Sequence, residues 1–182
     1  KPTVRNTQKS AVYSLKGACM LWRRDIFERL GCFNEDYFAY FEETDLCHRA
    51  INAGYKLLFD PSAKIIHLGG FTSKNMRQDF IQYYNTKNRV QTFISELPSN
   101  IVFSLVLSNF VLTELLIGKA LFLSPQLAYN MQLGLIVGFF TGLQKRWTTQ
   151  KQRVSLNLVM KKPDISYYLA LFSSLKNYQK LW

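Results

Sequence analysis

The chain has 182 residues, of which 48% are hydrophobic and 19% charged, and it carries a formal net charge of +11. This length and apolar content suffice for one domain with a core and exclude a disordered chain. The excess of Lys and Arg predicts an acidic partner, such as anionic lipid, a phosphorylated substrate or nucleic acid. Cys19, Cys32 and Cys47 form no CxxC pair, which favours a reducing compartment over a disulfide framework or a zinc site.

The charge divides the chain into three predicted zones. Residues 1–98 carry fourteen basic and ten acidic side chains, residues 99–143 carry only Glu114 and Lys119, and residues 144–182 carry eight basic side chains against the single Asp164. The first zone is typical of a soluble α/β domain, the second of a protein core or a membrane interface, and the third of a basic amphipathic tail. We predict these three segments as the domain organisation.

The first zone contains clear start and stop signals for secondary structure. Apolar spacing predicts helices over residues 24–30 and 42–53, which Gly31 and Gly54 close. Two apolar runs, residues 55–59 and 63–67, predict strands separated by an Asp-Pro-Ser turn. Apolar side chains at mostly three- and four-residue steps from residue 76 to residue 97 predict an amphipathic helix that ends before a proline.

The second zone is apolar enough to meet a membrane. Residues 97–113 and 120–144 contain no charged side chain, but Ser, Asn and Gln residues make neither run a clean membrane span, and Pro125 breaks the second. We predict two hydrophobic helices that lie along or dip into a membrane interface. The basic residues from Lys145 onward would meet anionic lipid on the cytoplasmic face of the cell membrane. The alternative is a helical layer that packs against the first zone.

The densest group of functional side chains lies in residues 33–45, where carboxylates and amides alternate with aromatic rings. Aromatic walls raise the pKa of a carboxylate, and neighbouring carboxylates repel each other, which is how a general base is tuned. The mixture is also typical of a sugar-binding cleft, where rings stack on the sugar and carboxylates bind its hydroxyls. The alternative is that Glu42, Glu43 and Asp45 are solvated acids that interact with the dipole at a helix start.

His67 ends the second predicted strand and precedes Gly69 and Gly70. Strand ends beside glycines are where α/β folds build binding sites, and a neutral imidazole is a good ligand for a divalent metal. The alternative is a structural histidine.

Five motifs in the first zone together resemble the C-terminal half of a family 2 glycosyltransferase of the rhamnosyltransferase-like branch. Members carry G-A-x-M-x-x-R-R, G-G-F-D-E, F-E-D-x-D-L-x-x-R, A-G-Y and P-x-A-x-x-x-H in this order. The similar segments here are residues 17–24, 31–35, 41–49, 53–55 and 61–67. The family's next element, Y-Y-x-x-R-N, resembles Tyr83-Tyr84 followed by Lys87-Asn88-Arg89.

The resemblance implies a partial GT-A fold within the α/β class, followed by hydrophobic and amphipathic helices. It implies an inverting transfer of a sugar, with rhamnose as a candidate, from a nucleotide-sugar donor. The acceptor would be a lipid-linked or polysaccharide glycan of cell-envelope or O-antigen biosynthesis. A carboxylate would take the proton of the acceptor hydroxyl, while Mg²⁺ or Mn²⁺ would stabilise the charge of the departing diphosphate.

The resemblance also assigns roles to individual residues. Glu43 matches the catalytic base and His67 a ligand of the metal. The predicted substrate-binding residues, of which the last two would organise the base and the acceptor pocket, are Asn34, Glu35, Glu42, Asp45 and Arg49. Two positions depart from the family: Asn34 replaces Asp, and Glu43 replaces Asp, which moves the base outward by about 1.5 Å, one carbon–carbon bond. Both changes bear on the choice of donor more than on the reaction class.

The sequence shows no D-x-D metal motif and no nucleotide-binding half, and it opens on a polar, basic run without Met or an apolar signal segment. We therefore expect a fragment with an incomplete metal site and no activity alone. Two other classes remain open: a non-catalytic membrane-binding remnant and a nucleic-acid binder. Because the basic residues cluster behind an apolar block, we predict no nucleic-acid partner.

Overall fold

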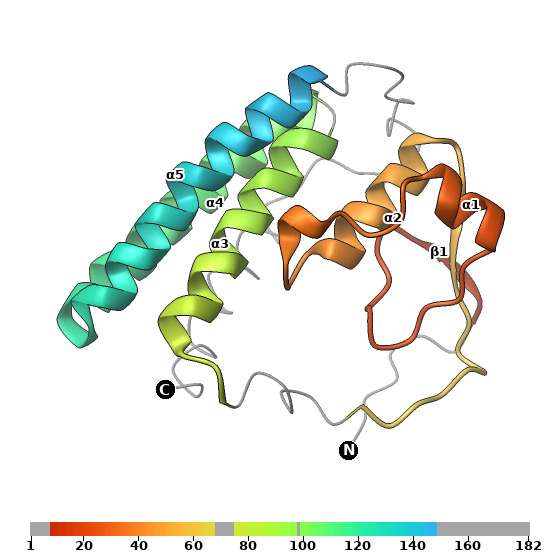
Figure 1. The fold of residues 1–182 in the computed structure, drawn as a ribbon, viewed down its shortest axis with the longest axis horizontal. Helices are drawn as coiled ribbons and strands as arrows, with labels where there is room; N and C mark the ends of the chain where they lie inside the picture. The colour runs from red at the N-terminus through yellow and green to blue at the C-terminus, as the bar shows by residue number, and fades with distance from the viewer. Residues whose placement is uncertain (1–7, 68–74, 98, 149–182) are drawn as a thin grey trace.

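The computed structural model describes residues 8–67, 75–97 and 99–148. Long helices dominate these residues, with a smaller unit of short elements beside them (Figure 1). The elements in chain order are β1 (Ser10–Val12), α1 (Arg24–Arg29), the 3₁₀ helix η1 (Glu35–Tyr37), α2 (Glu42–Asn52), β2 (Leu57–Phe59), α3 (Gln78–Glu96), α4 (Ser99–Leu123) and α5 (Pro125–Thr148). The described part of the chain is therefore mostly helical, with less strand than the predicted α/β class.

The helices end where the sequence predicted. Gly31 follows the C-cap of α1 with a φ of 84°, and Gly54 follows that of α2 with a φ of 86°. Glycine adopts this left-handed backbone without a clash of a Cβ, which is why it closes helices. The amphipathic helix α3 and a pair of apolar helices that changes direction at Pro125 are also confirmed.

The sheet differs from the prediction. β1, which the sequence did not predict, pairs antiparallel with β2, with Ser10 opposite Phe59. The predicted turn is present, because Asp60 Oδ1 accepts hydrogen bonds from the backbone nitrogen and hydroxyl of Ser62 at 3.0 and 2.7 Å. The predicted strand over residues 63–67 is wrong: these residues are exposed and pair with no strand among the described residues. Apolar content alone does not supply the neighbouring strand that a ladder needs.

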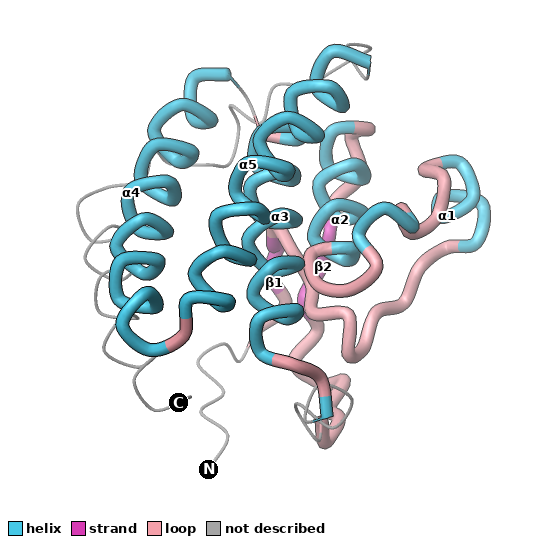
Figure 2. The backbone as a smooth tube through the Cα atoms, turned by 60° about the vertical axis from the view of Figure 1, so that its left-hand side comes forward, coloured by secondary structure: helices cyan, strands magenta, loops and turns pink. Residues whose placement is uncertain are grey.

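Helix α5 packs directly on α3 through glycines at every fourth position. Gly134, Gly138 and Gly142 are buried on one face of α5. A Cβ at Gly134 would lie 2.6 Å from the carbonyl oxygen of Tyr83, and one at Gly138 would collide with that of Lys87. The absence of side chains therefore lets the two backbones approach. Figure 2 shows α5 between α4 and α3, with α2 on the far side of α3.

Two apolar cores flank a polar layer. One core joins α4 and α5, and the other joins α2, β2 and the loop before α1. Between them α3 buries polar side chains, among which Thr86, Asn88, Gln91, Thr92 and Ser95 are at most 3% exposed. The pair α4 and α5 thus forms a helical layer against α3, and the predicted contact of these helices with a membrane stays a prediction. No helix in the described ranges is long and apolar enough to cross a membrane.

Candidate functional site

The segment that joins η1 to α2 has a left-handed backbone at three aromatic residues. The φ angles are 55° at Phe38, 66° at Tyr40 and 69° at Phe41. Asn88, fully buried on α3, holds this segment, because its side-chain nitrogen donates to the carbonyl oxygens of Tyr37 and Tyr40 at 2.8 Å. Non-glycine residues adopt positive φ only where their surroundings fix them, and such positions concentrate at functional sites. The fixed segment leads directly into Glu42 and Glu43.

Two of the predicted substrate-binding residues lie at the start of this segment. Asn34 caps η1, since its Oδ1 accepts a hydrogen bond from the backbone nitrogen of Asp36 at 3.0 Å. Glu35 is exposed. The ammonium of Lys87 on α3 donates to the carbonyl oxygen of Asp36 at 2.8 Å. Asn34 thus has a local structural role, whereas the Glu35 carboxylate faces solvent.

Glu42 and Glu43 form the first turn of α2, and both are half-buried. One carboxylate oxygen of each is buried without a hydrogen-bond partner among the described residues. Burial raises the pKa of Glu42, and the neighbouring Glu43 charge acts in the same direction. A buried acceptor that lacks a partner is costly unless a ligand or water satisfies it. The two acids are therefore the described carboxylates best placed to receive a hydroxyl group.

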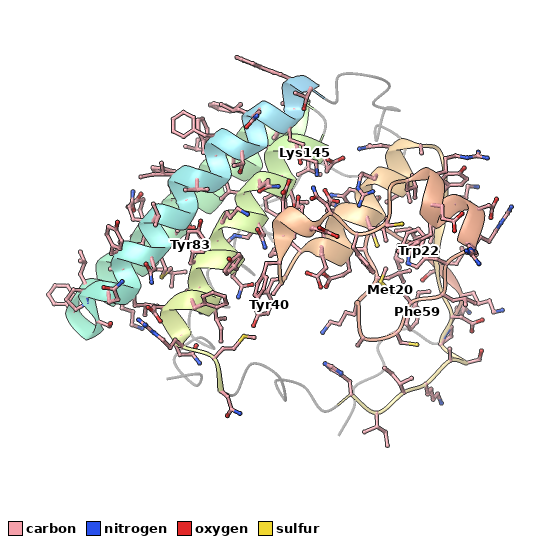
Figure 3. The ribbon with its side chains drawn as sticks, viewed as in Figure 1. Met20, Trp22, Tyr40, Phe59, Tyr83 and Lys145 are labelled. Carbon is pink, nitrogen blue, oxygen red and sulfur yellow. The ribbon has the colours of Figure 1, made fainter. Side chains whose placement is uncertain are left out.

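A depression of 430 Å³ lies next to a residue that contacts Glu43, namely Gly17. Gly17 lines it, and a Cβ built on Gly17 would lie 3.5 Å from the side chain of Glu43. Its aromatic wall includes Trp22 and Phe27, whose ring centroids are 6.3 Å apart, and Trp22 Nε1 is buried without a partner among the described residues. Trp22 lies on the side of α2 away from α3 (Figure 3). Aromatic rings can stack on the apolar face of a sugar, and a hydrogen-bond donor beside them can bind a sugar hydroxyl, so this lining suits a saccharide.

Asp45 and Arg49 lie inside the protein. Asp45 has no exposed surface and accepts hydrogen bonds from Tyr37 at 3.1 Å and from Arg49 Nε, one turn further along α2, at 2.8 Å. The guanidinium of Arg49 also donates to the carbonyl oxygens of Leu30 and Cys32. These two side chains join α2 to η1 and to the loop after α1, so they position the segment that carries the acids.

Sequence reasoning missed the long-range members of this cluster. Lys145, near the end of α5, forms an ion pair with Asp45, and its nitrogen lies 3.6 Å from a carboxylate oxygen of Glu96 on α3. Thr92 donates to the Tyr37 hydroxyl at 2.9 Å. Burial raises the pKa of Glu96 against the opposing effect of Lys145, and burial together with the Asp45 charge raises the pKa of Tyr37. No local sequence pattern pairs residues this far apart.

His67 lies far from these acids in the sequence, and its side chain differs from theirs in burial. It is exposed, in the extended stretch that follows the turn at residues 60–62. Over residues 8–67, 75–97 and 99–148, no group of three His, Cys, Asp or Glu side chains could hold a metal ion. The described residues therefore do not by themselves fit Mg²⁺ or Mn²⁺, and the role of His67 as a ligand stays a prediction.

The structure thus gathers the predicted residues of the 34–49 segment around the first turn of α2. Glu42 and Glu43 each hold a buried carboxylate oxygen without a partner among the described residues, and Glu43 lies against Gly17 at the edge of the depression. Asn34 caps η1, and the Asp45–Arg49 ion pair supports the turn. The functional residues that the sequence did not single out are the supporting ones, Asn88 and Lys145. Asn88 belongs to the quoted Lys87-Asn88-Arg89 element, which was the one available signal.

Comparison with known proteins finds glycosyltransferases. The N-acetylglucosaminyl-diphospho-decaprenol L-rhamnosyltransferase of Mycobacterium tuberculosis is 43% identical over 53 residues, which are 29% of this chain and 17% of that protein. The low-salt glycan biosynthesis hexosyltransferase Agl10 of Haloferax volcanii is 30% identical over 103 residues, 54% of this chain and 30% of that protein. The chain therefore matches less than a third of the length of either relative.

No family model matches the chain, and no solved structure matches it significantly. Both partial similarities are to sugar transferases, which agrees with the class of the predicted resemblance.

Proposed function

We propose that the protein transfers a sugar from a nucleotide-sugar to a glycan or lipid-linked acceptor of the cell envelope, by an inverting, GT-A-type reaction. The observation that carries the proposal is the Glu43 carboxylate, which has a buried oxygen without a partner among the described residues and follows the aromatic segment of positive φ angles. The Glu43 side chain also lies against Gly17, which lines an aromatic depression. The similarity to a rhamnosyltransferase supports rhamnose as the sugar to test first.

In the proposed reaction Glu43 is the general base. Its carboxylate takes the proton of the acceptor hydroxyl while that oxygen bonds to the anomeric carbon of the donor sugar. The bond from that carbon to the nucleotide diphosphate breaks, and its electron pair leaves with the diphosphate. Because attack comes from the face opposite the leaving group, the anomeric configuration inverts. General-base catalysis of this kind is worth about 10²–10⁴-fold in rate.

In the proposed reaction Asp45 is a positioning residue that does not contact the substrate. It has no exposed surface with which to contact a substrate, and its bonds to Tyr37 and Arg49 fix the turn that carries Glu43. The roles of Glu35, Glu42 and Arg49 in binding substrate remain part of the proposal.

The decisive experiment uses the protein expressed from its complete reading frame. It would be assayed with a panel of nucleotide-sugars, dTDP-L-rhamnose first, and an N-acetylglucosaminyl-diphospho-polyprenol acceptor. Glu43→Gln should lower the rate of transfer at least about 100-fold. Glu28→Gln, which changes an exposed acid of α1, should leave the rate unchanged. Equal rates for both variants would remove Glu43 from the mechanism, and the product's anomeric configuration by NMR would test inversion.

The apolar helices favour a membrane as the setting of this reaction. On α4 a stripe at helical spacing is exposed, and α5 adds exposed rings at Tyr129, Phe140 and Trp147. The α4 stripe consists of Phe103, Leu107, Phe110, Val111, Leu115 and Phe122. Exposed apolar patches of this extent mark interaction sites, and the basic residues beyond α5 in the sequence suit anionic lipid. We therefore propose attachment to the cytoplasmic face of the cell membrane.

Vesicle flotation would test this attachment. The wild-type protein should float with vesicles that contain phosphatidylglycerol, and a Phe103→Ser, Phe122→Ser variant should stay in the dense fraction. If the double variant floats as well as the wild type, α4 does not contact the lipid.

A further inference from the structure

A second depression lies where the first turns of α3 and α5 meet, and it shares no lining residue with the one at Gly17. The segment of residues 38–41, with positive φ angles at Phe38, Tyr40 and Phe41, is called the strained segment below. Its volume is 390 Å³. Aromatic rings from α3 form one wall, and polar side chains from both helices form its edge. Tyr83 is labelled in Figure 3 on α3, where that helix faces α5. Neither the comparisons nor the quoted motifs assign a ligand to this place.

The aromatic wall is a continuous cluster of rings. Tyr84 is central, with its ring centroid 4.7 Å from that of Phe80 and 5.1 Å from that of Tyr83. Phe38 adds a fourth ring at 5.2 Å from Tyr84, and Phe38 itself is 65% exposed. Because Phe38 belongs to the strained segment before Glu42, the cluster continues towards the candidate catalytic acids.

The polar edge is arranged in advance of any ligand. Asp79 accepts hydrogen bonds from the guanidinium of Arg77 at 2.7 and 3.1 Å and from the amide of Asn130 at 2.9 Å. Gln126, one turn before Asn130 on α5, is exposed. The edge therefore presents a carboxylate, two amides and a guanidinium, all of them planar groups that can bind pairs of hydroxyls.

We propose that this depression binds a saccharide unit of the acceptor glycan, an inference that rests on the proposed function. Rings that stack on the apolar face of a sugar, together with planar groups that bond its hydroxyls, are the chemistry that a neutral saccharide requires. A lipid chain would cover the polar edge without offering it a hydrogen bond, and a phosphate would meet the Asp79 carboxylate. The saccharide is therefore the ligand that both sides of the depression fit.

The test uses the complete protein and saturation-transfer NMR with N-acetylglucosamine, N,N′-diacetylchitobiose and L-rhamnose. At least one of these should bind the wild-type protein. Tyr84→Leu, which removes the central ring, should weaken that binding about fivefold, whereas Tyr84→Phe should retain it, since stacking is worth about 1 kcal/mol. Tyr129→Ala removes an exposed ring of α5 that does not line the depression and should bind as the wild type does.

A replacement variant and a kinetic assay distinguish loss of saccharide binding from a failure to fold. Gln126→Ala, on the surface, replaces Tyr84→Leu if the latter fails to fold, and it should also weaken binding. In transfer assays, either variant should raise KM for the acceptor and leave kcat unchanged. No binding of any of the three saccharides to the wild type, or equal binding by all variants, would overturn the proposal. Glu43→Gln should bind saccharide as the wild type does. If Glu43 proves not to be the catalytic base, the proposal of a saccharide site at this depression is therefore unaffected.

Discussion

Lys145 and Asp45 are one hundred residues apart in the sequence and form an ion pair in which the Asp45 carboxylate is fully buried. The contact joins the end of α5 to the helix that carries Glu42 and Glu43. A buried carboxylate that loses a cationic partner is left in a medium that does not solvate it, which costs several kcal/mol.

We therefore expect Lys145→Met to lower the free energy of unfolding by about 3 kcal/mol. Lys119→Met makes the same substitution at an exposed position of α4 and should change the free energy of unfolding by less than about 0.5 kcal/mol. Denaturant unfolding of both variants provides the measurement. Similar midpoints for the two would show that the ion pair contributes little to stability.

Asn88→Ala should destabilise the protein by about 2 kcal/mol, because it leaves buried carbonyl oxygens of the strained segment without a donor. It should also lower the rate of transfer, since the segment leads into Glu42 and Glu43. Asn85→Ala, on the same helix, is the matched control, with little effect on either quantity. A stable and fully active Asn88→Ala variant would mean that the left-handed backbone does not depend on this amide.

Stability should fall in acid because of His48. Burial lowers the pKa of His48 to about 4, against the opposing effect of Asp45. An unfolded histidine, with a pKa near 6.5, binds a proton at a higher pH than the folded one does. Below about pH 6.5 protonation therefore favours the unfolded state, and the loss is complete below about pH 4.

The loss attributable to His48 should total about 3 kcal/mol. His48→Leu removes the titrating group, so its stability should change less than that of the wild type between pH 6.5 and pH 4. Unfolding curves at a series of pH values measure this difference. Parallel pH profiles for the two proteins would assign the acid sensitivity to other groups.

Gly138→Ala should destabilise the protein by about 2 kcal/mol, because the new methyl group meets the backbone of Lys87 and forces α5 away from α3. At Gly118 of α4 an added Cβ would meet nothing within 4 Å. Gly118→Ala should therefore stabilise the protein by about 0.5–1 kcal/mol through helix propensity alone. Thermal unfolding should move in opposite directions for the two variants, and a rise for both would argue against close backbone contact.

Local patterns predicted the elements well. Helices and their glycine ends follow from spacing and backbone preference within a few residues, as at Gly31 and Gly54. The strand over residues 63–67 failed because a strand depends on a partner, and β1 took that position beside β2. The partner lies far away in the sequence, so no window around residues 63–67 contains the information.

The same distinction applies to the candidate site. The cluster from Asn34 to Arg49 is contiguous, so the sequence could reveal it. The supports that reach it from α3 and α5 could not be paired from one sequence, although four-residue spacing of Gly134, Gly138 and Gly142 was visible. Glycines at this spacing occur in helices for several reasons, and only the structure shows that these three face α3.

The backbone contact between α3 and α5 has a consequence for how the protein opens. The backbones of α3 and α5 are in contact, and the ion pair between Lys145 and Asp45 links them to α2. These three helices should therefore exchange their amide hydrogens as one cooperative unit. Helix α4 touches this unit through an apolar seam and should open at lower free energy. We therefore expect the turn that bears Glu43 to be attached to the part of the described chain whose amide hydrogens exchange most slowly, so that its geometry should stay constant when the apolar surface of α4 changes its surroundings.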